Sequence, residues 1–240
     1  MARIIPTLAG DVHVLPRDAA FAELARRLNA QVAARPVAVG LSGGSTPKAF
    51  YAWARAQSAL SFETLVRTDW HVSDERCVPL WSDDSNFGHA ARGLLDPLGV
   101  PALRRHPWPI EFTPAVAAEA YDDAWTRRSP RRAFDLCVLG LGDDSHIASL
   151  WPGCPLIGAP GLPRFAATEW PGRGWRLTIT EAGLAQCGAI VVLVNGKSKA
   201  AALRAVCEGD FAPATHPGQV LRAWSAKVTW LADEEAAALL

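Results

Sequence analysis

The chain has 240 residues, half of which are apolar, and its 24 acidic side chains balance its 24 basic ones. A balanced charge leaves no overall field that would hold nucleic acid or an acidic membrane surface, so neither is expected as a partner. A chain of this length buries roughly 70% of its unfolded surface, which suffices for one large core. We expect a single domain over residues 1–240.

The cysteines and the N-terminal residues predict a cytoplasmic protein. Five cysteines are odd in number and lack CxxC spacing, so we expect reduced, mostly buried thiols. Pro6, Gly10 and Asp11 interrupt the first residues, and no later apolar run approaches roughly 18 residues, so no signal peptide or membrane span is expected. The ten tryptophans are scattered and not grouped with Arg or Lys, which favours packing over an aromatic binding platform.

Apolar runs typical of buried strands alternate with stretches of helical periodicity along the chain. A helix is expected after Asp18, ending near Arg35-Pro36, and a buried strand at Pro36–Leu41 precedes a helix that begins at Pro47. The other expected strands lie at 12–15, 70–72, 134–141, 175–180, 189–194 and 227–231. The other expected helices lie around 86–95, 114–127, 197–207 and 232–240. Residues 151–174, which are rich in proline and glycine, are expected to form a long loop.

This alternation predicts an α/β fold with a doubly wound, mostly parallel sheet and helices on both faces. In such a sheet, ligands bind beyond the carboxyl ends of the strands. The polar segments that directly follow apolar runs are therefore the candidate sites, and four segments qualify.

The first segment is the glycine-rich stretch Ser42–Thr46. Adjacent Gly43 and Gly44 permit positive φ and close approach, so backbone N–H groups can converge on an anion at the start of the following helix. A turn with no ligand is the alternative. The stretch also matches the G-x-S-x-G nucleophile elbow of serine hydrolases around Ser42, but the expected helix start at Pro47 is too far from this serine for an elbow.

Basic residues at strand ends mark two further segments. Arg76 follows two carboxylates after the run at 70–72 and can present a guanidinium fork to a phosphate, with a surface ion-pair cluster as the alternative. Arg176 opens the run at 175–180, and Lys199 follows the run at 189–194. A lysine in the first turn of a helix opposes the helix dipole, so we expect Lys199 to serve a bound anion; an ordinary solvated lysine is the alternative, and it is stronger for Lys197.

The remaining segment, Gly140–Gly153, carries Asp143, Asp144 and His146 directly after an apolar run. An aspartate can fix the tautomer of a histidine and keep it suited to general acid and base work. The other five histidines show no metal-ligand spacing, so no zinc site is expected.

Taken together, five stretches resemble the 6-phosphogluconolactonase family in order and spacing, over the chain from about residue 36 to its end. They are GLSGGSTP (40–47), SDERCVPLWSDDSN (73–86), LGLGDDSHIASLWPG (139–153), RLTIT (176–180) and NGKSKA (195–200). The resemblance implies a modified Rossmann-like fold without metal or nucleotide cofactor. It also implies hydrolysis of 6-phospho-D-glucono-1,5-lactone to 6-phospho-D-gluconate, a step of the oxidative pentose phosphate pathway.

The resemblance also implies roles for individual residues. The family histidine falls on His146, which would activate water and then protonate the leaving ring oxygen, and the aspartate that orients it falls on Asp144. The family's phosphate contacts map onto Gly43, Gly44, Ser45, Thr46, Arg76, Arg176 and Lys199. Ser145 stands where the family has glycine. If that position requires positive φ, the serine is strained by about 1 kcal/mol or more.

Two other functions remain as alternatives, and the oligomeric state is left open. The related glucosamine-6-phosphate deaminases and isomerases share GGSTP and GKSKA, but their Asn-Glu-Pro after His-Ile-Ala is replaced here by Ser149-Leu150-Trp151-Pro152. A non-catalytic sugar-phosphate sensor is the second alternative. Sensors with similar folds carry a DNA-binding helix-turn-helix, for which this chain has neither spare length nor a basic segment.

Overall fold

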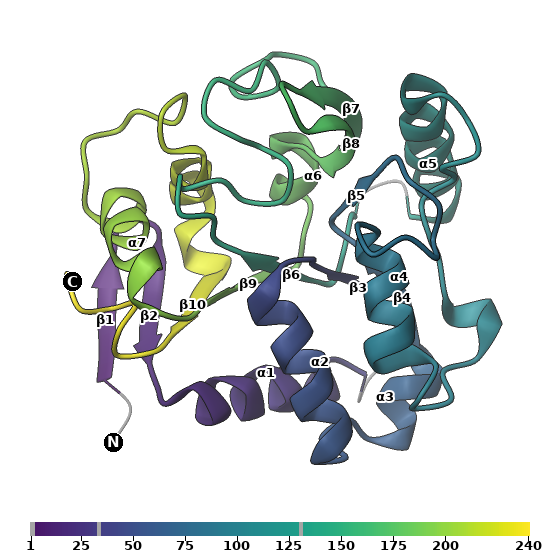
Figure 1. The fold of residues 1–240 in the computed structure, drawn as a ribbon, viewed down its shortest axis with the longest axis horizontal. Coiled ribbons are helices and arrows are strands. Elements are labelled where there is room, and N and C mark those ends of the chain that lie inside the picture. Colours follow the sequence, from purple (N-terminus) through teal and green to yellow (C-terminus); the bar gives the residue numbers. More distant parts are fainter. Residues whose placement is uncertain (1–2, 33–34, 130–131) are drawn as a thin grey trace.

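The computed structural model of the chain describes residues 3–32, 35–129 and 132–240. A seven-stranded sheet has the strand order β1-β2-β10-β9-β6-β3-β4, and a three-stranded sheet has the order β5-β8-β7 (Figure 1). The strands of the large sheet are β1 (Arg3–Thr7), β2 (Gly10–Val14), β3 (Val37–Leu41), β4 (Thr68–Val72), β6 (Leu136–Gly140), β9 (Ala189–Val194) and β10 (Val228–Ala232). The strands of the small sheet are β5 (Asp74–Arg76), β7 (Phe165–Trp170) and β8 (Gly174–Ile179).

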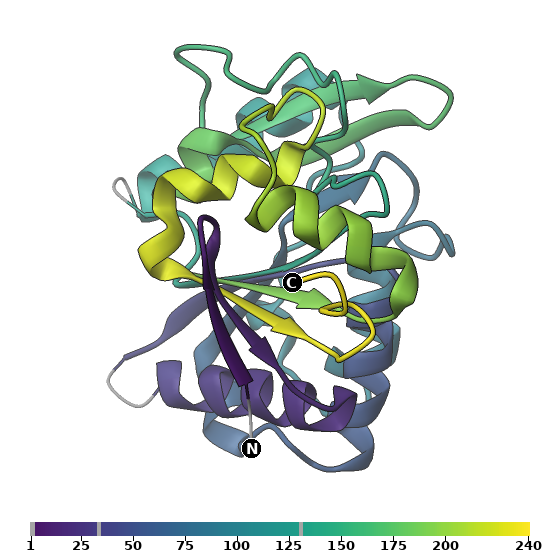
Figure 2. The same cartoon turned by 90° about the vertical axis from the view of Figure 1, so that its left-hand side faces the viewer.

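Helices cover both faces of the large sheet. The α-helices are α1 (Arg17–Gln31), α2 (Ser45–Ala56), α3 (Phe62–Arg67), α4 (Asn86–Ala90), α5 (Pro114–Arg128), α6 (Glu181–Ala185) and α7 (Ala200–Cys207). A π-helical turn at Ala91–Leu95 continues α4, and 3₁₀ segments occupy Ala102–Arg104, Lys197–Lys199 and Pro217–Lys227. Figures 1 and 2 show α1 and α2 below the large sheet, with α7 and the segment Pro217–Lys227 above it. This arrangement confirms the predicted α/β fold with helices on both faces.

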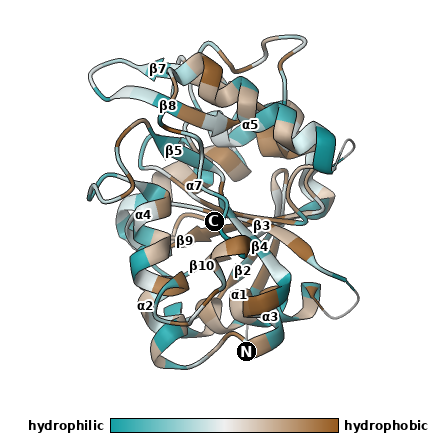
Figure 3. Cartoon of the chain, turned by 90° about the vertical axis from the view of Figure 1, so that its right-hand side faces the viewer, coloured by the Kyte–Doolittle hydropathy of each residue, from teal (hydrophilic) through white to brown (hydrophobic). Residues whose placement is uncertain are grey.

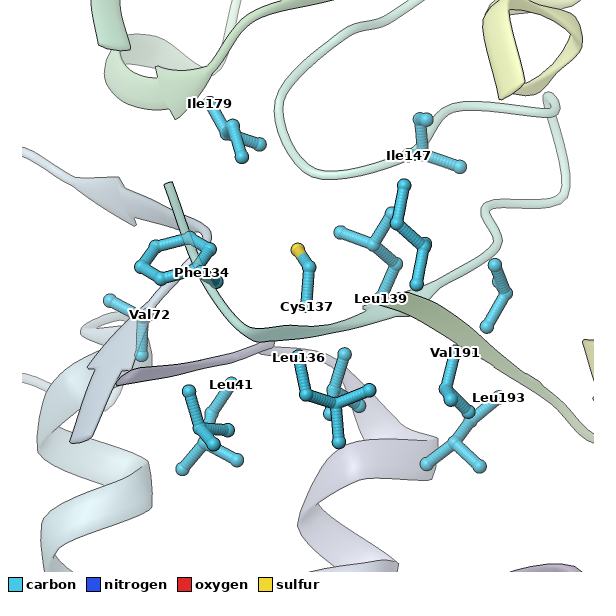
Figure 4. Packing of buried hydrophobic residues seen from close by; sticks show 14 of the residues in the cluster. Leu41, Val72, Phe134, Leu136, Cys137, Leu139, Ile147, Ile179, Val191 and Leu193 are labelled. Carbon is cyan, nitrogen blue, oxygen red and sulfur yellow. The ribbon is translucent and has the colours of Figure 1, made fainter. Parts of the chain in front are cut away.

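The central strands are buried on both faces, which explains their uninterrupted apolar sequences. All residues of β3 are buried. Figure 4 shows Cys137 and Leu139 on one side of β6 and Leu136 on the other, so successive side chains fill both layers of the core. In Figure 3 the helices carry both brown and teal residues, as expected of amphipathic helices on a sheet. None of the described helices combines the length and the apolar character that a membrane span requires.

The direction in which the chain adds strands to the large sheet reverses between β3 and β6. The neighbours β2–β10, β10–β9, β9–β6, β6–β3 and β3–β4 are parallel, and the edge pair β1–β2 is antiparallel. From β3 the chain continues to β4 on one side, whereas from β6 it continues to β9 on the other. The pairing of β3 with β6 joins Val39 to Leu136 and Gly40 to Cys137. Such a reversal of direction is where open α/β sheets bind ligands.

The small sheet differs from the sequence-based expectation. The run predicted at 175–180 forms β8, which pairs antiparallel with β5 and β7 and does not join the large sheet. The stretch 151–174, predicted to be a long loop, contains β7. Strands β7 and β8 pack against α5. The buried side chains of Phe165, Leu177 and Ile179 gain a second hydrophobic layer there.

Two smaller expectations also need correction, and strand β1 was not predicted. Residues 232–240 form turns and not a helix. Helix α2 begins at Ser45 and not at Pro47, because the first helical turn has no intrahelical acceptor for its N–H groups and so tolerates a proline. Strand β1 contains Pro6, which an edge strand accepts. The cysteine prediction is confirmed: the five thiols are free, and all are buried except the half-buried Cys77.

Candidate active site

A cavity of about 260 Å³ lies at the carboxyl ends of β3 and β6. Residues from all four polar segments singled out in the sequence line it. The predicted site residues in its wall are Gly43, Gly44, Ser45, Thr46, Arg76, His146, Arg176 and Lys199. The remaining predicted residue, Asp144, is bonded to His146. The structure therefore brings together residues that lie more than a hundred positions apart in the chain.

The glycine-rich loop forms the entrance to helix α2. Gly44 has φ +92°, a conformation that side-chain-bearing residues rarely adopt, and it lets the chain turn from β3 into the helix. Ser45 and Thr46 form the first helical turn, where N–H groups have no intrahelical acceptor. Both residues line the cavity, and the positive end of the helix dipole favours an anion at this place.

Arg76 and Arg176 are directly opposite each other in the small sheet. In the described part of the chain neither forms an ion pair with a carboxylate; Arg76 donates to the Asp84 carbonyl at 2.6 Å and Arg176 to its neighbour's carbonyl at 3.0 Å. Burial lowers the pKa of Arg176, and the charge of Arg76 lowers it further. Like charges facing each other across a sheet are unfavourable, and a bound anion would relieve the repulsion.

The carboxylate beside Arg76 has a structural task. Glu75 is fully buried and accepts hydrogen bonds from the N–H groups of Asn86 and Phe87 at 2.6 and 2.8 Å, and from the Ser85 hydroxyl at 3.0 Å. Burial raises its pKa. The alternative of a surface ion-pair cluster is wrong for this segment. Through these hydrogen bonds Glu75 instead joins the start of α4 to β5, the strand that carries Arg76.

His146 is held in the loop that follows β6. Its Nδ1–H donates to Asp144 Oδ1 at 2.5 Å, and its backbone N–H donates to the same oxygen at 3.1 Å. A side chain at Gly142 would come within 1.9 Å of His146 Nδ1, so this position accepts only glycine. The next residue, Ile147, is fully buried and lies on the same side of β6 as Leu139 (Figure 4).

This geometry leaves one nitrogen of His146 for chemistry. The imidazole is 29% exposed and lines the cavity, and because Asp144 occupies Nδ1, Nε2 is the nitrogen that remains for a water molecule or a substrate. Burial raises the pKa of Asp144, but the hydrogen bond and the charge of His146 outweigh burial and the net shift is downward. A carboxylate that stays ionised and holds Nδ1–H is the arrangement that makes the other nitrogen a base.

Ser145 has the strained backbone that the resemblance implied. Its φ is +69°, in the left-handed region, and its side chain is buried. Three contacts hold it there: its carbonyl accepts from the Gly218 N–H at 2.8 Å, its N–H donates to the Gly142 carbonyl at 3.0 Å, and its hydroxyl lies 3.2 Å from His216 Nδ1. The serine therefore bears the strain of a positive φ.

Lys199 lines the cavity, whereas Lys197 is not among its lining residues. The Lys199 ammonium lies 2.5 Å from Asp143 Oδ1, and this contact holds the pKa of Asp143 below its usual range. Part of the Lys199 charge is thus already neutralised. It faces an incoming anion with less free charge than Arg76 or Arg176.

Sequence reasoning missed several residues of the cavity wall. Asp74 is buried and accepts a hydrogen bond from the Ser149 hydroxyl at 2.8 Å. Trp170 and Arg173 come from the end of β7 and the turn before β8, within the stretch that was predicted to be a loop. The dipeptide Pro171-Gly172 between two β-forming runs is a turn signal that would have found this hairpin. Within the described residues, no group of His, Cys, Asp and Glu side chains is placed to hold a metal ion.

The serine-hydrolase alternative finds no support in this geometry. Ser42 is buried in the cavity wall, and its carbonyl accepts from the Tyr51 hydroxyl at 2.6 Å. In the part of the chain that the structure describes, no histidine is hydrogen-bonded to the Ser42 hydroxyl. A nucleophilic serine requires such a base.

Comparisons with known proteins identify the family of the chain. Residues 16–230 match the family model described as glucosamine-6-phosphate isomerases/6-phosphogluconolactonase. A 6-phosphogluconolactonase of Synechocystis is 33% identical over 209 residues, which cover 82% of this chain and 82% of that protein.

Solved structures share the fold. The 6-phosphogluconolactonase from Trypanosoma cruzi superposes with a TM-score of 0.82 at 22% identity, over 95% of this chain and 96% of that one. A monomeric glucosamine-6-phosphate deaminase superposes with a TM-score of 0.78 at 19% identity, over 95% and 99%. The fold alone therefore does not separate the two activities. The chain belongs to the glucosamine-6-phosphate isomerase/6-phosphogluconolactonase family.

Proposed function

We propose that this protein hydrolyses 6-phospho-D-glucono-1,5-lactone to 6-phospho-D-gluconate in the oxidative pentose phosphate pathway. One observation carries the proposal: an imidazole whose Nδ1 is held by Asp144 shares a cavity with a helix N-terminus and with guanidinium groups that form no ion pair within the described residues. The similarity to the Synechocystis protein, which is named a 6-phosphogluconolactonase, supports it. The free, mostly buried thiols suit a reducing compartment, and we place the reaction in the cytoplasm.

The proposed mechanism uses His146 twice. Nε2 accepts a proton from a water molecule as that water attacks the lactone carbonyl, and a tetrahedral intermediate forms at C1. When the intermediate collapses, the bond from C1 to the ring oxygen breaks, and the protonated imidazole gives its proton to that oxygen. Asp144 keeps Nδ1 protonated throughout, which stabilises the imidazolium and fixes the ring. No proton is gained or lost by the enzyme over the cycle.

The phosphate end of the substrate is assigned to the cationic part of the cavity. Arg76 and Arg176 supply two guanidinium groups, and the Gly43–Thr46 loop supplies N–H and hydroxyl donors. Each hydrogen bond to a charged group contributes roughly 1.5–3 kcal/mol, so several give micromolar binding without help from net charge. Lys199 is expected to contribute less than the arginines because Asp143 already pairs with it.

A coupled spectrophotometric assay tests the proposal. Freshly generated 6-phosphogluconolactone is the substrate, the 6-phosphogluconate formed is oxidised by its dehydrogenase with reduction of NADP, and spontaneous hydrolysis is subtracted. We expect the wild-type protein to accelerate hydrolysis and His146→Ala to lose most of this activity. Release of ammonia from glucosamine 6-phosphate without lactone hydrolysis would instead identify a deaminase. Hydrolysis by the wild type no faster than the spontaneous rate, with phosphosugar binding retained, would favour a sensor.

A further inference from the structure

The turn between β7 and β8 reaches the cavity but has no part in the mechanism above. Trp170 ends β7 opposite Gly174, and the Arg173 N–H donates to the Trp170 carbonyl at 2.9 Å. Pro171 followed by Gly172 at φ +72° fits a type II turn, in which proline sets the first corner and glycine takes the positive φ of the second. The tip is therefore preorganised. Figure 2 shows the hairpin extending beyond the body on the side to which β9 and β10 point.

Trp170 lies against the imidazole of His146. The two rings meet at 78° with their centroids 5.2 Å apart. Trp151 stacks on Trp170 at 5.0 Å with an angle of 14° between the rings, so the indole is itself held in place. His146 is thus fixed from two directions, by Asp144 at Nδ1 and by Trp170 at the ring. An aromatic contact of this kind limits rotation of the imidazole and keeps water from one of its sides.

Arg173 adds a third guanidinium to the cationic part of the cavity. Its guanidinium carbon lies 4.7 Å from the centre of the Trp170 ring, over the ring. In the described ranges it forms no ion pair with a carboxylate, and its charge helps to lower the pKa of Arg176. Asp74, bound to Ser149, offsets part of the positive charge in the cavity. Three guanidinium groups in one cavity without their own carboxylates repel each other, and a dianionic ligand would relieve that repulsion.

We propose that the turn Trp170–Arg173 is a substrate-recognition element, in which Arg173 binds the phosphate of the substrate and Trp170 is a positioning residue that holds the His146 ring. The identity of the substrate rests on the proposed function. The assignment of Arg173 to the phosphate follows from its shared cavity with Arg76 and Arg176. Trp170 joins this cationic part of the cavity to the imidazole because it contacts both Arg173 and His146.

Arg173 is tested with Arg173→Ala and Arg173→Lys, and with Arg204→Ala as the control, since Arg204 is an exposed arginine on α7 outside the cavity. We measure KM and kcat for the lactone, and by calorimetry the Kd of 6-phosphogluconate and of gluconate. Loss of a charged contact predicts a rise of about tenfold in KM and in the Kd of 6-phosphogluconate for Arg173→Ala, with partial rescue by lysine. The Kd of gluconate should not change. An equal rise in the Kd of both ligands, or no rise in the Kd of either, overturns the assignment.

Trp170 is tested with Trp170→Ala, Trp170→Leu and Trp170→Phe, and with Trp175→Ala as the control, because Trp175 is an exposed indole of the same hairpin outside the cavity. We expect kcat to fall about tenfold for alanine with little change in KM, the pH profile of kcat/KM to move, and phenylalanine to restore most of the activity. Thermal unfolding is followed for each variant. Trp170→Leu retains apolar bulk, so it replaces Trp170→Ala in the test if that variant fails to fold. Unchanged kcat and pH profile in folded Trp170→Leu, or an equal loss in Trp175→Ala, overturns the role.

Failure of the proposed function gives a different result from failure of this inference. If the wild-type protein does not hydrolyse the lactone, the proposed function fails, and the ratio of the Kd values of 6-phosphogluconate for Arg173→Ala and wild type still decides whether Arg173 binds phosphate. If the wild type hydrolyses the lactone and both the Arg173 and the Trp170 variants match it, the inference alone fails.

Discussion

His146 and His71 show how far the surroundings decide what a histidine can do. His146 is 29% exposed in an open cavity and has one nitrogen on Asp144. His71, within β4, is 3% exposed; its ring stacks on His106 at 4.7 Å, and its Nδ1 lies 2.7 Å from the Tyr121 hydroxyl. Its Nε2 has no hydrogen-bond partner in the described part of the chain.

The electrostatic surroundings of His71 also make it unsuited to catalysis. Burial lowers the pKa of His71 well below its usual value, and the nearby His106 and Arg128 lower it further, so this imidazole stays neutral. It cannot exchange protons in the way that catalysis at neutral pH requires. The comparison teaches that position after a strand, with one nitrogen accessible, marks a reactive histidine, whereas position within a strand marks a packed one.

The largest effect is expected at His146. His146→Ala should lower kcat by roughly a thousandfold, since general acid and base catalysis contributes about 10²- to 10⁴-fold. Its free energy of unfolding should stay close to that of the wild type, because the ring is partly exposed. The coupled assay and urea unfolding measure the two quantities. Activity within tenfold of the wild type would contradict the role of His146.

His71→Ala is expected to do the reverse. Removal of a fully buried ring that packs against Tyr121 and Trp125 should lower the free energy of unfolding by about 2–4 kcal/mol, while kcat of the folded protein is retained. His71→Leu, which keeps apolar bulk, should recover part of the stability. A folded His71→Ala protein without activity would break the distinction between the two histidines.

Asp144→Asn should lower kcat by roughly a hundredfold, because an amide no longer selects the tautomer with Nδ1 protonated. The downward shift in the pKa of Asp144 means that its carboxylate is ionised over the whole neutral range. Loss of this charge destabilises the imidazolium, so the acid limb of kcat/KM against pH should move to lower pH. An acid limb that stays in place, measured against the wild type in the same buffers, would contradict this.

The pKa of Asp69, whose carboxylate lies 3.1 Å from His106 Nε2, predicts how stability depends on pH. Burial raises its pKa, but His106, Arg128 and Arg104 outweigh burial and hold the pKa below its usual value. Its stabilising contribution is therefore present above about pH 4 and is lost as the pH falls below that value. Urea unfolding from pH 7 to pH 2 should show this loss. Asp69→Asn should cost about 2 kcal/mol at pH 7 and flatten the acid decline. An equally steep decline in the variant would refute the assignment.

Ser145→Gly is expected to have the smallest effect. Glycine relieves the strain of φ +69°, about 1–2 kcal/mol, but loses the contact with His216 and adds entropy to the unfolded chain. These contributions offset each other, so the free energy of unfolding should change by less than about 1 kcal/mol and kcat by less than about twofold. A larger change in kcat would show that the serine alters the orientation of His146.

The sequence predicts the site best where local rules suffice. The Gly43–Thr46 loop and His146 directly follow buried parallel strands, and the carboxyl ends of such strands meet at one edge, so their proximity could be predicted. The pairing of Arg76 with Arg176 could not, because it depends on an antiparallel sheet whose strands come from distant segments. The strand order of the large sheet also depends on long-range packing that no local pattern encodes.

Trp170 and Arg173 were missed for a different reason. Proline and glycine are dense over 151–174, and this composition is typical of loops, so β7 and the turn that follows it were hidden in the predicted loop, whereas the run that forms β8 was predicted as a strand. The scattered tryptophans predicted packing, which is right for Trp151 and incomplete for Trp170, since this indole also lines the cavity. Whether an aromatic side chain borders a ligand depends on the final position of its strand.

The three guanidinium groups of the cavity, which form no ion pair within the described residues, come from β5, β8 and the β7–β8 turn, whereas the imidazole comes from a loop of the large sheet. The guanidinium groups and the imidazole thus come from different sheets, and Trp170 of the small sheet contacts both Arg173 and His146. Laboratory evolution of the β7–β8 hairpin that leaves Trp170 unchanged would therefore be able to retune which acidic sugar is accepted without removing the contact that holds His146.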